Sequence, residues 1–81
     1  MERISREFFV LSKLHEAGAV DEERAMEIDK VKKIVEINPD ELEKILEFLE
    51  SKKYIAKKGN EKLRKVYVTR LGIIMASSLY T

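Results

Sequence analysis

The fold is decided by two neighbouring stretches, LEFLESKKYIAKKG at residues 46–59 and KVYVTRLGIIMASSLYT at residues 65–81. In the first, an apolar helical stripe gives way to a short strand over residues 54–58 and then to a Gly-Asn turn signal. In the second, apolar and polar side chains alternate over residues 63–69, as in a half-buried strand. Together these patterns predict a β-hairpin with a tip of about four or five residues.

A helix is predicted on each side of this hairpin. Before it, Asn38 is an N-cap and Pro39 takes the first helical position, so a helix should run from there to about Lys52. After it, Thr69 should cap a last helix over residues 70–80. The expected core stripes of these two helices are Leu42, Ile45, Leu46 and Leu49 in one, and Leu71, Ile74, Met75 and Leu79 in the other.

The first part of the chain adds two more helices. Apolar residues at helical spacing predict a first helix that ends at Gly18. A short second helix is expected near residues 29–36, with Asp29 as its N-cap. Residues 19–28 fit either an extension of the first helix or a charged loop that ends in a short strand at residues 25–28.

The order helix, possible strand, helix, helix, hairpin, helix predicts a winged helix-turn-helix, mostly α with a small antiparallel β-hairpin. Residues 29–81 resemble small prokaryotic and archaeal winged-helix DNA-binding proteins, in which a leucine-rich helix, an aromatic-isoleucine pair, a wing and a Tyr-x-Thr-x-x-Gly motif follow one another. The resemblance implies DNA binding and a role as a small transcription regulator. The residues that carry it are Leu46, Leu49, Lys53, Tyr54, Ile55, Tyr67, Thr69 and Gly72.

A narrower likeness concerns the last helix. Residues 68–72, VTRLG, followed by SLY at residues 78–80, are similar to the end of the winged-helix domain in archaeal Hjm-type repair helicases. The chain has no G-x-x-x-x-G-K-[ST] phosphate loop, so it lacks the motor of those enzymes. This likeness implies at most a related winged helix, alone or as an accessory piece.

Length and composition limit the other classes of protein. The 81 residues fit one domain, residues 1–81, because single domains run from about 50 to 250 residues. The absence of cysteine excludes disulfides, zinc–thiolate sites and a thiol nucleophile. The single histidine, His15, has no carboxylate partner fixed by spacing, and no acidic cluster has metal-ligand spacing. We therefore expect no catalytic residue, no metal and no cofactor.

The composition also bears on the source of the protein. The chain has no glutamine and only two asparagines, while lysine and glutamate dominate, as is typical of hyperthermophile proteins. No apolar run approaches the roughly 20 residues of a membrane span, and the first residues lack the apolar core of a signal peptide. We expect a cytoplasmic protein of an archaeal thermophile, with no membrane partner.

Charge is divided unevenly along the chain. Residues 1–50 carry 14 acidic and 8 basic side chains, whereas residues 51–81 carry 8 basic side chains and one acid, although the net charge is only +1. The basic part coincides with the hairpin, where lysine and arginine can neutralise phosphates of double-stranded DNA. The alternative is a solvated basic hairpin that discourages edge-to-edge pairing. The predicted DNA contacts are Lys53, Lys57, Lys58, Lys62, Arg64, Lys65 and Arg70.

The third predicted helix argues against the usual mode of base readout. Such a helix normally enters the major groove, but the exposed side of this one carries Asp40, Glu43, Glu47 and Glu50 beside Lys44. Four acids near a phosphate lattice are repulsive, so we expect the wing to contact DNA instead. The alternative function is a protein-interaction module, accessory to a repair, replication or transcription complex, whose acidic third helix docks a basic partner.

Apolar residues outside the core stripes predict a homodimer. Phe9 points away from the apolar arc of the first helix, and Ile73 and Tyr80 lie nearly eclipsed on one side of the last helix. A patch of these three residues would form a self-complementary two-fold contact. The alternative is that single exposed apolar residues have no function, since they are common on protein surfaces.

Overall fold

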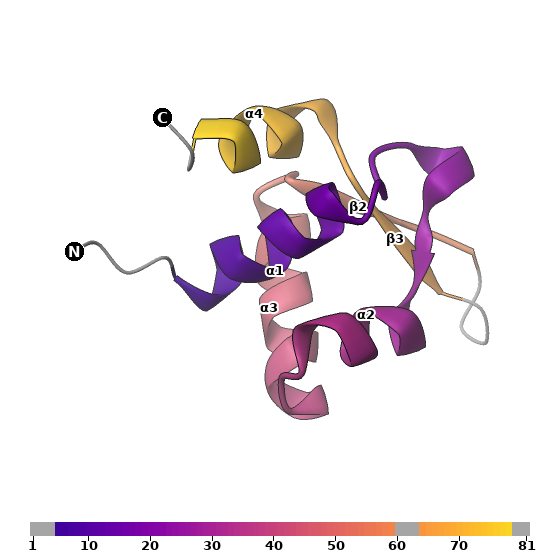
Figure 1. The fold of residues 1–81 in the computed structure, drawn as a ribbon, viewed down its shortest axis with the longest axis vertical. Coiled ribbons are helices and arrows are strands. Elements are labelled where there is room, and N and C mark those ends of the chain that lie inside the picture. Colours follow the sequence, from indigo (N-terminus) through magenta and orange to yellow (C-terminus); the bar gives the residue numbers. More distant parts are fainter. Residues whose placement is uncertain (1–4, 60–63, 79–81) are drawn as a thin grey trace.

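The computed structural model describes residues 5–59 and 64–78, and this part of the chain forms four α-helices, a 3₁₀ turn and three strands (Figure 1). The predicted order of elements is confirmed, and the charged segment after the first helix is a loop with a short strand. The elements are α1 (Arg6–Glu16), η1 (Glu22–Arg24), β1 (Met26–Glu27), α2 (Ile28–Val35), α3 (Pro39–Ser51), β2 (Ile55–Lys58), β3 (Lys65–Val68) and α4 (Arg70–Ser78).

Most helix ends lie where the sequence places them. At the start of α3 the side-chain oxygen of Asn38 accepts a hydrogen bond from the N–H of Asp40 at 2.9 Å, with Pro39 at the first helical position. Gly18 follows the C-cap of α1 with φ of 84°, a left-handed conformation that glycine adopts without strain. Both capping predictions are confirmed.

The predicted N-cap of α2 is wrong by two positions. The helix begins at Ile28, so Asp29 lies in its first turn and Glu27 takes the N-cap position without a side-chain hydrogen bond. The N–H of Ile28 instead donates to the carbonyl oxygen of Arg64, just before β3, at 3.2 Å. A contact with a distant strand therefore replaces the local cap that the sequence predicts.

The three strands form one antiparallel sheet in the order β1-β3-β2. In the hairpin, which comprises β2 and β3, Ile55 pairs with Val68 and Lys57 pairs with Val66. Residues opposite each other in an antiparallel pair point to the same face. The inner face therefore carries these four side chains, and the outer face carries Ala56, Lys58, Lys65 and Tyr67. Most of the predicted tip lies outside the described residues.

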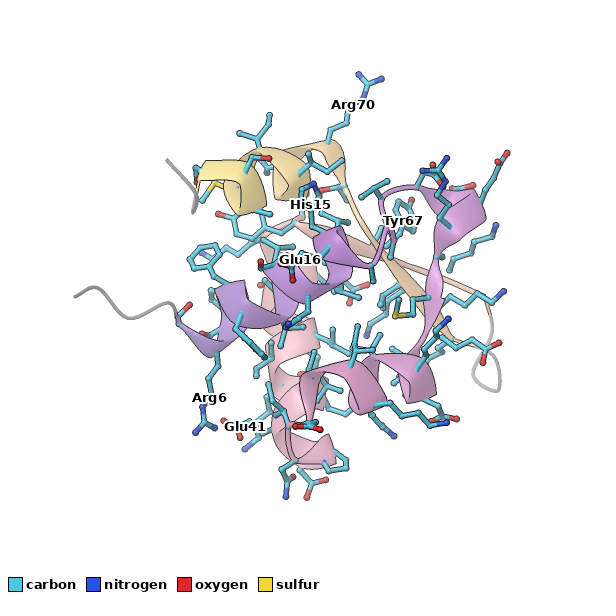
Figure 2. All side chains as sticks on the ribbon, in the orientation of Figure 1. Arg6, His15, Glu16, Glu41, Tyr67 and Arg70 are labelled. Atoms are coloured by element: carbon cyan, nitrogen blue, oxygen red, sulfur yellow. The ribbon has the colours of Figure 1, made fainter. Side chains whose placement is uncertain are left out.

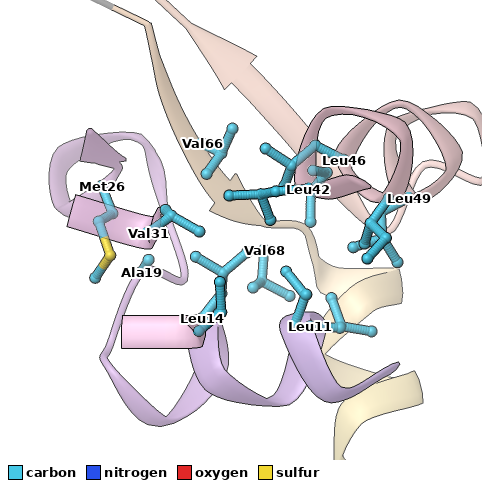
Figure 3. Close-up of a cluster of buried hydrophobic side chains, with 14 of the residues drawn as sticks. Leu11, Leu14, Ala19, Met26, Val31, Leu42, Leu46, Leu49, Val66 and Val68 are labelled. Atoms are coloured by element: carbon cyan, nitrogen blue, oxygen red, sulfur yellow. The ribbon is translucent and has the colours of Figure 1, made fainter. Parts of the chain in front are cut away.

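The core lies between α1, α2, α3 and the inner face of the sheet (Figure 3). The stripe predicted for α3 is confirmed, because all four of its residues are buried. Figure 1 shows α1 crossing the molecule between α4 and the pair formed by α2 and α3. The fully buried side chains of largest volume are Leu11, Leu14, Leu42, Leu46, Leu49 and Ile55, with Val10, Val31, Val66 and Val68.

The core stripe predicted for α4 is wrong. Leu71 is 45% exposed and Ile74 is 64% exposed, while Met75 is half-buried and Leu79 lies outside the described residues. Of the predicted residues only Met75 packs against the core, and the other residues of α4 that face inward are Gly72, Ile73 and Ala76. The helix is therefore rotated about its axis relative to the prediction.

A close approach at Gly72 explains this rotation. A Cβ atom at this position would overlap the carbonyl oxygen of Tyr54 in the segment before β2. The glycine thus lets the backbone of α4 lie directly against that segment, while Leu71 and Ile74 turn outward. Apolar spacing alone cannot reveal such a contact, because the residue that makes it has no side chain.

Candidate nucleic-acid interface

A tight turn joins α3 to β2, and the last helix is tied to it. Lys53 has a left-handed backbone, with φ of 64°, and the N–H of Tyr54 donates to the carbonyl oxygen of Leu49 at 3.0 Å. The hydroxyl of Thr69 donates to the carbonyl oxygen of Lys53 at 2.6 Å and accepts from the N–H of Gly72 at 3.1 Å. Thr69 is therefore the predicted cap of α4 and also fixes the hairpin beside α3.

The predicted DNA contacts fall into three groups in the structure. Lys53 and Arg70 are exposed at the base of the hairpin, one on each side of it. Lys57 and Arg64 turn toward α3, whereas Lys58 and Lys65 belong to the outer face of the sheet. Lys62 lies outside the described residues. The hairpin therefore does not present its cations as one patch.

The two cations on the inner face are paired with carboxylates of α3. Arg64 Nη2 lies 3.1 Å from Glu43 Oε1, and Lys57 Nζ lies 3.3 Å from Glu50 Oε1. Glu43 and Glu50 are seven residues apart, so they lie two helical turns apart along one line of α3. The acidic side of the helix thus runs beside the basic side of the hairpin.

These ion pairs change the expectation about α3. Two of its four acids that we set against a phosphate lattice are neutralised within the chain, so their repulsion of DNA is weaker than that of free carboxylates. These pairs were not predicted from the sequence. Two features of the sequence point to them. Glu43 and Glu50 are seven residues apart, and the alternation of side chains along the hairpin places both Lys57 and Arg64 with Val66 on the inner face.

The rest of the exposed side of α3 is mixed in character. Asp40, Lys44 and Glu47 are exposed, and the ring of Phe48 is 41% exposed. Lys52 Nζ lies 5.7 Å from the centre of that ring, within the range of a cation–π contact. This side offers both charges and an aromatic ring to a partner.

The outer face of the sheet carries a second set of cations. Lys58 Nζ donates to the carbonyl oxygen of Glu22 at 3.2 Å, which ties β2 to the 3₁₀ turn. Lys65 lies between Lys58 of β2 and Glu27 of β1 in the strand register. A shallow hollow of about 380 Å³ is lined there by Lys65, Glu27, Met26, Ala25, Arg24, Lys30 and Ala17.

Of the three residues of the predicted dimer patch, the structure describes Phe9 and Ile73, which lie in different surroundings. Phe9 is 38% exposed and lines a hollow of about 370 Å³ beside the connection between α2 and α3, together with Arg6 and Glu41, which form an ion pair. Figure 2 shows that pair on the side of α1 away from α4. Ile73 packs against the core from α4, and Tyr80 lies outside the described residues.

Two further observations concern the part of the chain that the structure describes. In residues 5–59 and 64–78, no three His, Cys, Asp or Glu side chains are placed together so that they could hold a metal ion. No helix within the same ranges has the length and apolar character needed to cross a membrane.

No protein-family model matches the chain, and neither does any curated protein. Solved structures do match. TubR from Bacillus megaterium pBM400 superposes with a TM-score of 0.87 at 19% identity, over 98% of this chain and 88% of that chain. BpsR of Bordetella bronchiseptica, whose DNA binding is regulated by 6-hydroxynicotinic acid, gives 0.79 at 20% identity, over 98% of this chain and 54% of that chain.

A transcriptional regulator of the MarR family from Silicibacter pomeroyi gives a TM-score of 0.72 at 17% identity, over 95% of this chain and 50% of that chain. At these identities the likeness establishes the fold. The chain has the winged-helix fold. The narrower likeness to Hjm-type helicases stays a prediction.

Proposed function

We propose that this protein binds double-stranded DNA as a small transcription regulator and contacts the phosphate backbone through its basic hairpin. The observation that carries the proposal is that six of the seven predicted cations belong to the hairpin or flank it, and two of these six reach α3. Regulators such as BpsR and the MarR-family protein share this fold, which supports a common mode of action.

The physical basis is electrostatic. Lysine and arginine side chains that neutralise phosphates release condensed counterions, which gives affinity without base recognition. Lys53 and Arg70 are exposed on either side of the hairpin base, and Lys65 lies on the outer face near the other end of the hairpin, opposite Lys58. Such an arrangement favours contact along the DNA backbone.

The proposal also concerns where the protein acts. A role on DNA in a prokaryote implies a cytoplasmic protein. An archaeal thermophile stays the predicted source.

Binding to a generic duplex, measured by fluorescence anisotropy at about 50 and 200 mM salt, tests the proposal. We expect affinity to fall steeply with salt. It should be lost when four hairpin cations are replaced by alanine, but not when four cations of α1 and α2 are. Absence of binding at low salt contradicts the proposal. The hairpin variant replaces Lys57, Lys58, Arg64 and Lys65, and the control variant of equal charge replaces Arg6, Lys13, Lys32 and Lys33.

The same proposal includes a homodimer, now with α4 as its contact surface. Leu71 and Ile74 are the most exposed large apolar side chains of the described residues. Residues 71–81 carry no charge, in a chain that is 38% charged. Near a two-fold axis each side chain lies close to its own copy, so a charge there would meet the same charge. An uncharged apolar helix face fits such a contact.

A protein partner is the second candidate function. Asp40 and Glu47 remain exposed on α3 without an ion pair to any described residue, and Phe48 beside them is 41% exposed. An exposed aromatic ring flanked by acids fits a basic partner protein. This function predicts that the parent does not bind duplex at low salt, which is the result that contradicts the DNA proposal.

A further inference from the structure

We propose that Glu43 and Glu50 of α3 set how tightly the hairpin binds phosphate, because they hold two of its cations in the free protein. The inference rests on the proposed contact between the hairpin and DNA. It assigns to these two carboxylates a role as internal competitors of the DNA backbone. The acidic side of α3 then tunes a DNA contact that it does not itself make.

The position of Lys57 makes the competition direct. Lys57 is opposite Val66 in the hairpin, so its stem leaves the sheet on the inner face, toward α3. Its side chain is only 27% exposed, and its ammonium group lies 3.3 Å from Glu50. A phosphate that contacts this ammonium group meets a cation that is already paired with Glu50. Phosphate and carboxylate therefore compete for the same cation.

Arg64 repeats this arrangement two turns closer to the start of α3. Its guanidinium lies 3.1 Å from Glu43, and the two side chains are each 40% exposed. A guanidinium is planar and binds a carboxylate or a phosphate through the same donors. An Arg64 group that donates to Glu43 has fewer donors left for a phosphate. Each carboxylate thus occupies a cation that could neutralise the DNA backbone.

The exposure of both pairs determines the size of the effect. Partly exposed ion pairs are weak, so the carboxylates lower the affinity of the hairpin without preventing DNA contact. They reduce the sequence-independent term, which comes from phosphate contacts. The remaining contacts then contribute a larger share of the total affinity, and suppression of binding to wrong partners is one route to specificity.

A double-mutant cycle on DNA affinity tests the inference. The proteins are the parent, Glu43→Gln, Arg64→Gln and the double variant, each measured on one generic duplex at about 50 mM salt. We expect Glu43→Gln to bind about two- to five-fold more tightly than the parent. In the Arg64→Gln background the same change should give little gain, because no cation is left to release.

Glu47→Gln is the matched control. Glu47 lies between the two carboxylates on the same helix and is exposed, but it forms no ion pair with any described residue. Its replacement removes the same charge at a similar place without releasing a cation. We expect a smaller gain than for Glu43→Gln, and no dependence on Arg64. The pair of Glu50 and Lys57 provides a second, independent cycle.

Three results would overturn the inference while the DNA proposal stands. One is an equal gain for Glu43→Gln and Glu47→Gln, which means general repulsion only. Another is a gain that persists in the Arg64→Gln background. The third is weaker binding by Glu43→Gln, which means that the carboxylate orients Arg64 for DNA. Absence of binding by the parent and every variant, all shown to be folded by thermal unfolding, refutes the DNA proposal itself and this inference with it.

Discussion

α3 and α4 both lie on the surface of the molecule, but they expose opposite chemistry. α3 exposes carboxylates, and two of these are paired with cations of the hairpin. α4 exposes Leu71 and Ile74, and it has no charged side chain after Arg70. The difference indicates that the two helices serve different contacts. In our proposals the charged helix adjusts an electrostatic contact with a polyanion, whereas the apolar helix contacts another copy of the chain.

The close approach of Gly72 to Tyr54 orients α4, and a change at this position should have the largest effect on stability. We expect Gly72→Ala to destabilise the protein by about 1 to 3 kcal/mol, because the added Cβ overlaps the carbonyl oxygen of Tyr54 and forces the backbone apart. Unfolding in urea measures this loss. Ser77→Ala, on the exposed side of the same helix, should change stability by less than about 0.5 kcal/mol. If Gly72→Ala is as stable as the parent, the rotation of α4 has another cause.

The apolar side of α4 is tested by a change that places a charge on it. Ile74 is 64% exposed in the single chain, so Ile74→Glu should leave the fold intact. In a dimer built on this face, it should weaken association at least about tenfold, because the carboxylate would meet its own copy at the two-fold axis. Sedimentation equilibrium of the parent and the variant measures the change.

Phe9→Glu is the companion variant for the dimer test. Phe9 is also exposed, but it lies beside the connection between α2 and α3 rather than on α4. We expect its association to match that of the parent. If Phe9→Glu dissociates and Ile74→Glu does not, the interface lies at the end of α1 instead.

The caps of the two helices also differ in what they hold together. Asn38 caps α3 through one local hydrogen bond, whereas the hydroxyl of Thr69 both caps α4 and donates to the carbonyl oxygen of Lys53. We expect Thr69→Val to cost about 1 to 2 kcal/mol, more than Asn38→Ala. Thr69→Ser keeps the hydroxyl and should recover most of the loss in urea unfolding. A larger loss for Thr69→Ser than for Thr69→Val would assign the effect to the methyl group, which only the serine variant lacks.

The sequence predicted both helices, but it gave the buried side of α3 correctly and that of α4 mostly wrongly, for a physical reason. In α3 the charged residues mark the solvent side, so the stripe that contains Leu42 and Leu49 has one possible orientation. In α4 no charge marks that side, and both sides of the helix carry large apolar residues. The orientation then depends on the close approach at Gly72, which is a tertiary contact. Hydrophobic periodicity contains no information about it.

The candidate site was predictable in composition but not in arrangement. The sequence identifies the basic hairpin and the acidic third helix, and it treats them as separate surfaces with opposite consequences for DNA. Their pairing depends on the strand register, which places Lys57 opposite Val66 and so toward α3. Register is fixed by which face of a strand is buried. It follows from the sequence only once the packing of the hairpin against α3 is known.

The smallest expected effect is that of the ion pairs on stability. Arg64 and Glu43 are each 40% exposed, so Glu43→Gln should destabilise the protein by less than about 1 kcal/mol at low salt. At about 1 M salt the Debye length falls to about 3 Å, so the difference between the variant and the parent should largely disappear. Urea unfolding at both salt concentrations measures it. A loss that exceeds 1 kcal/mol and persists at high salt would mean that Glu43 holds the hairpin in place, and phosphate would then not displace it readily.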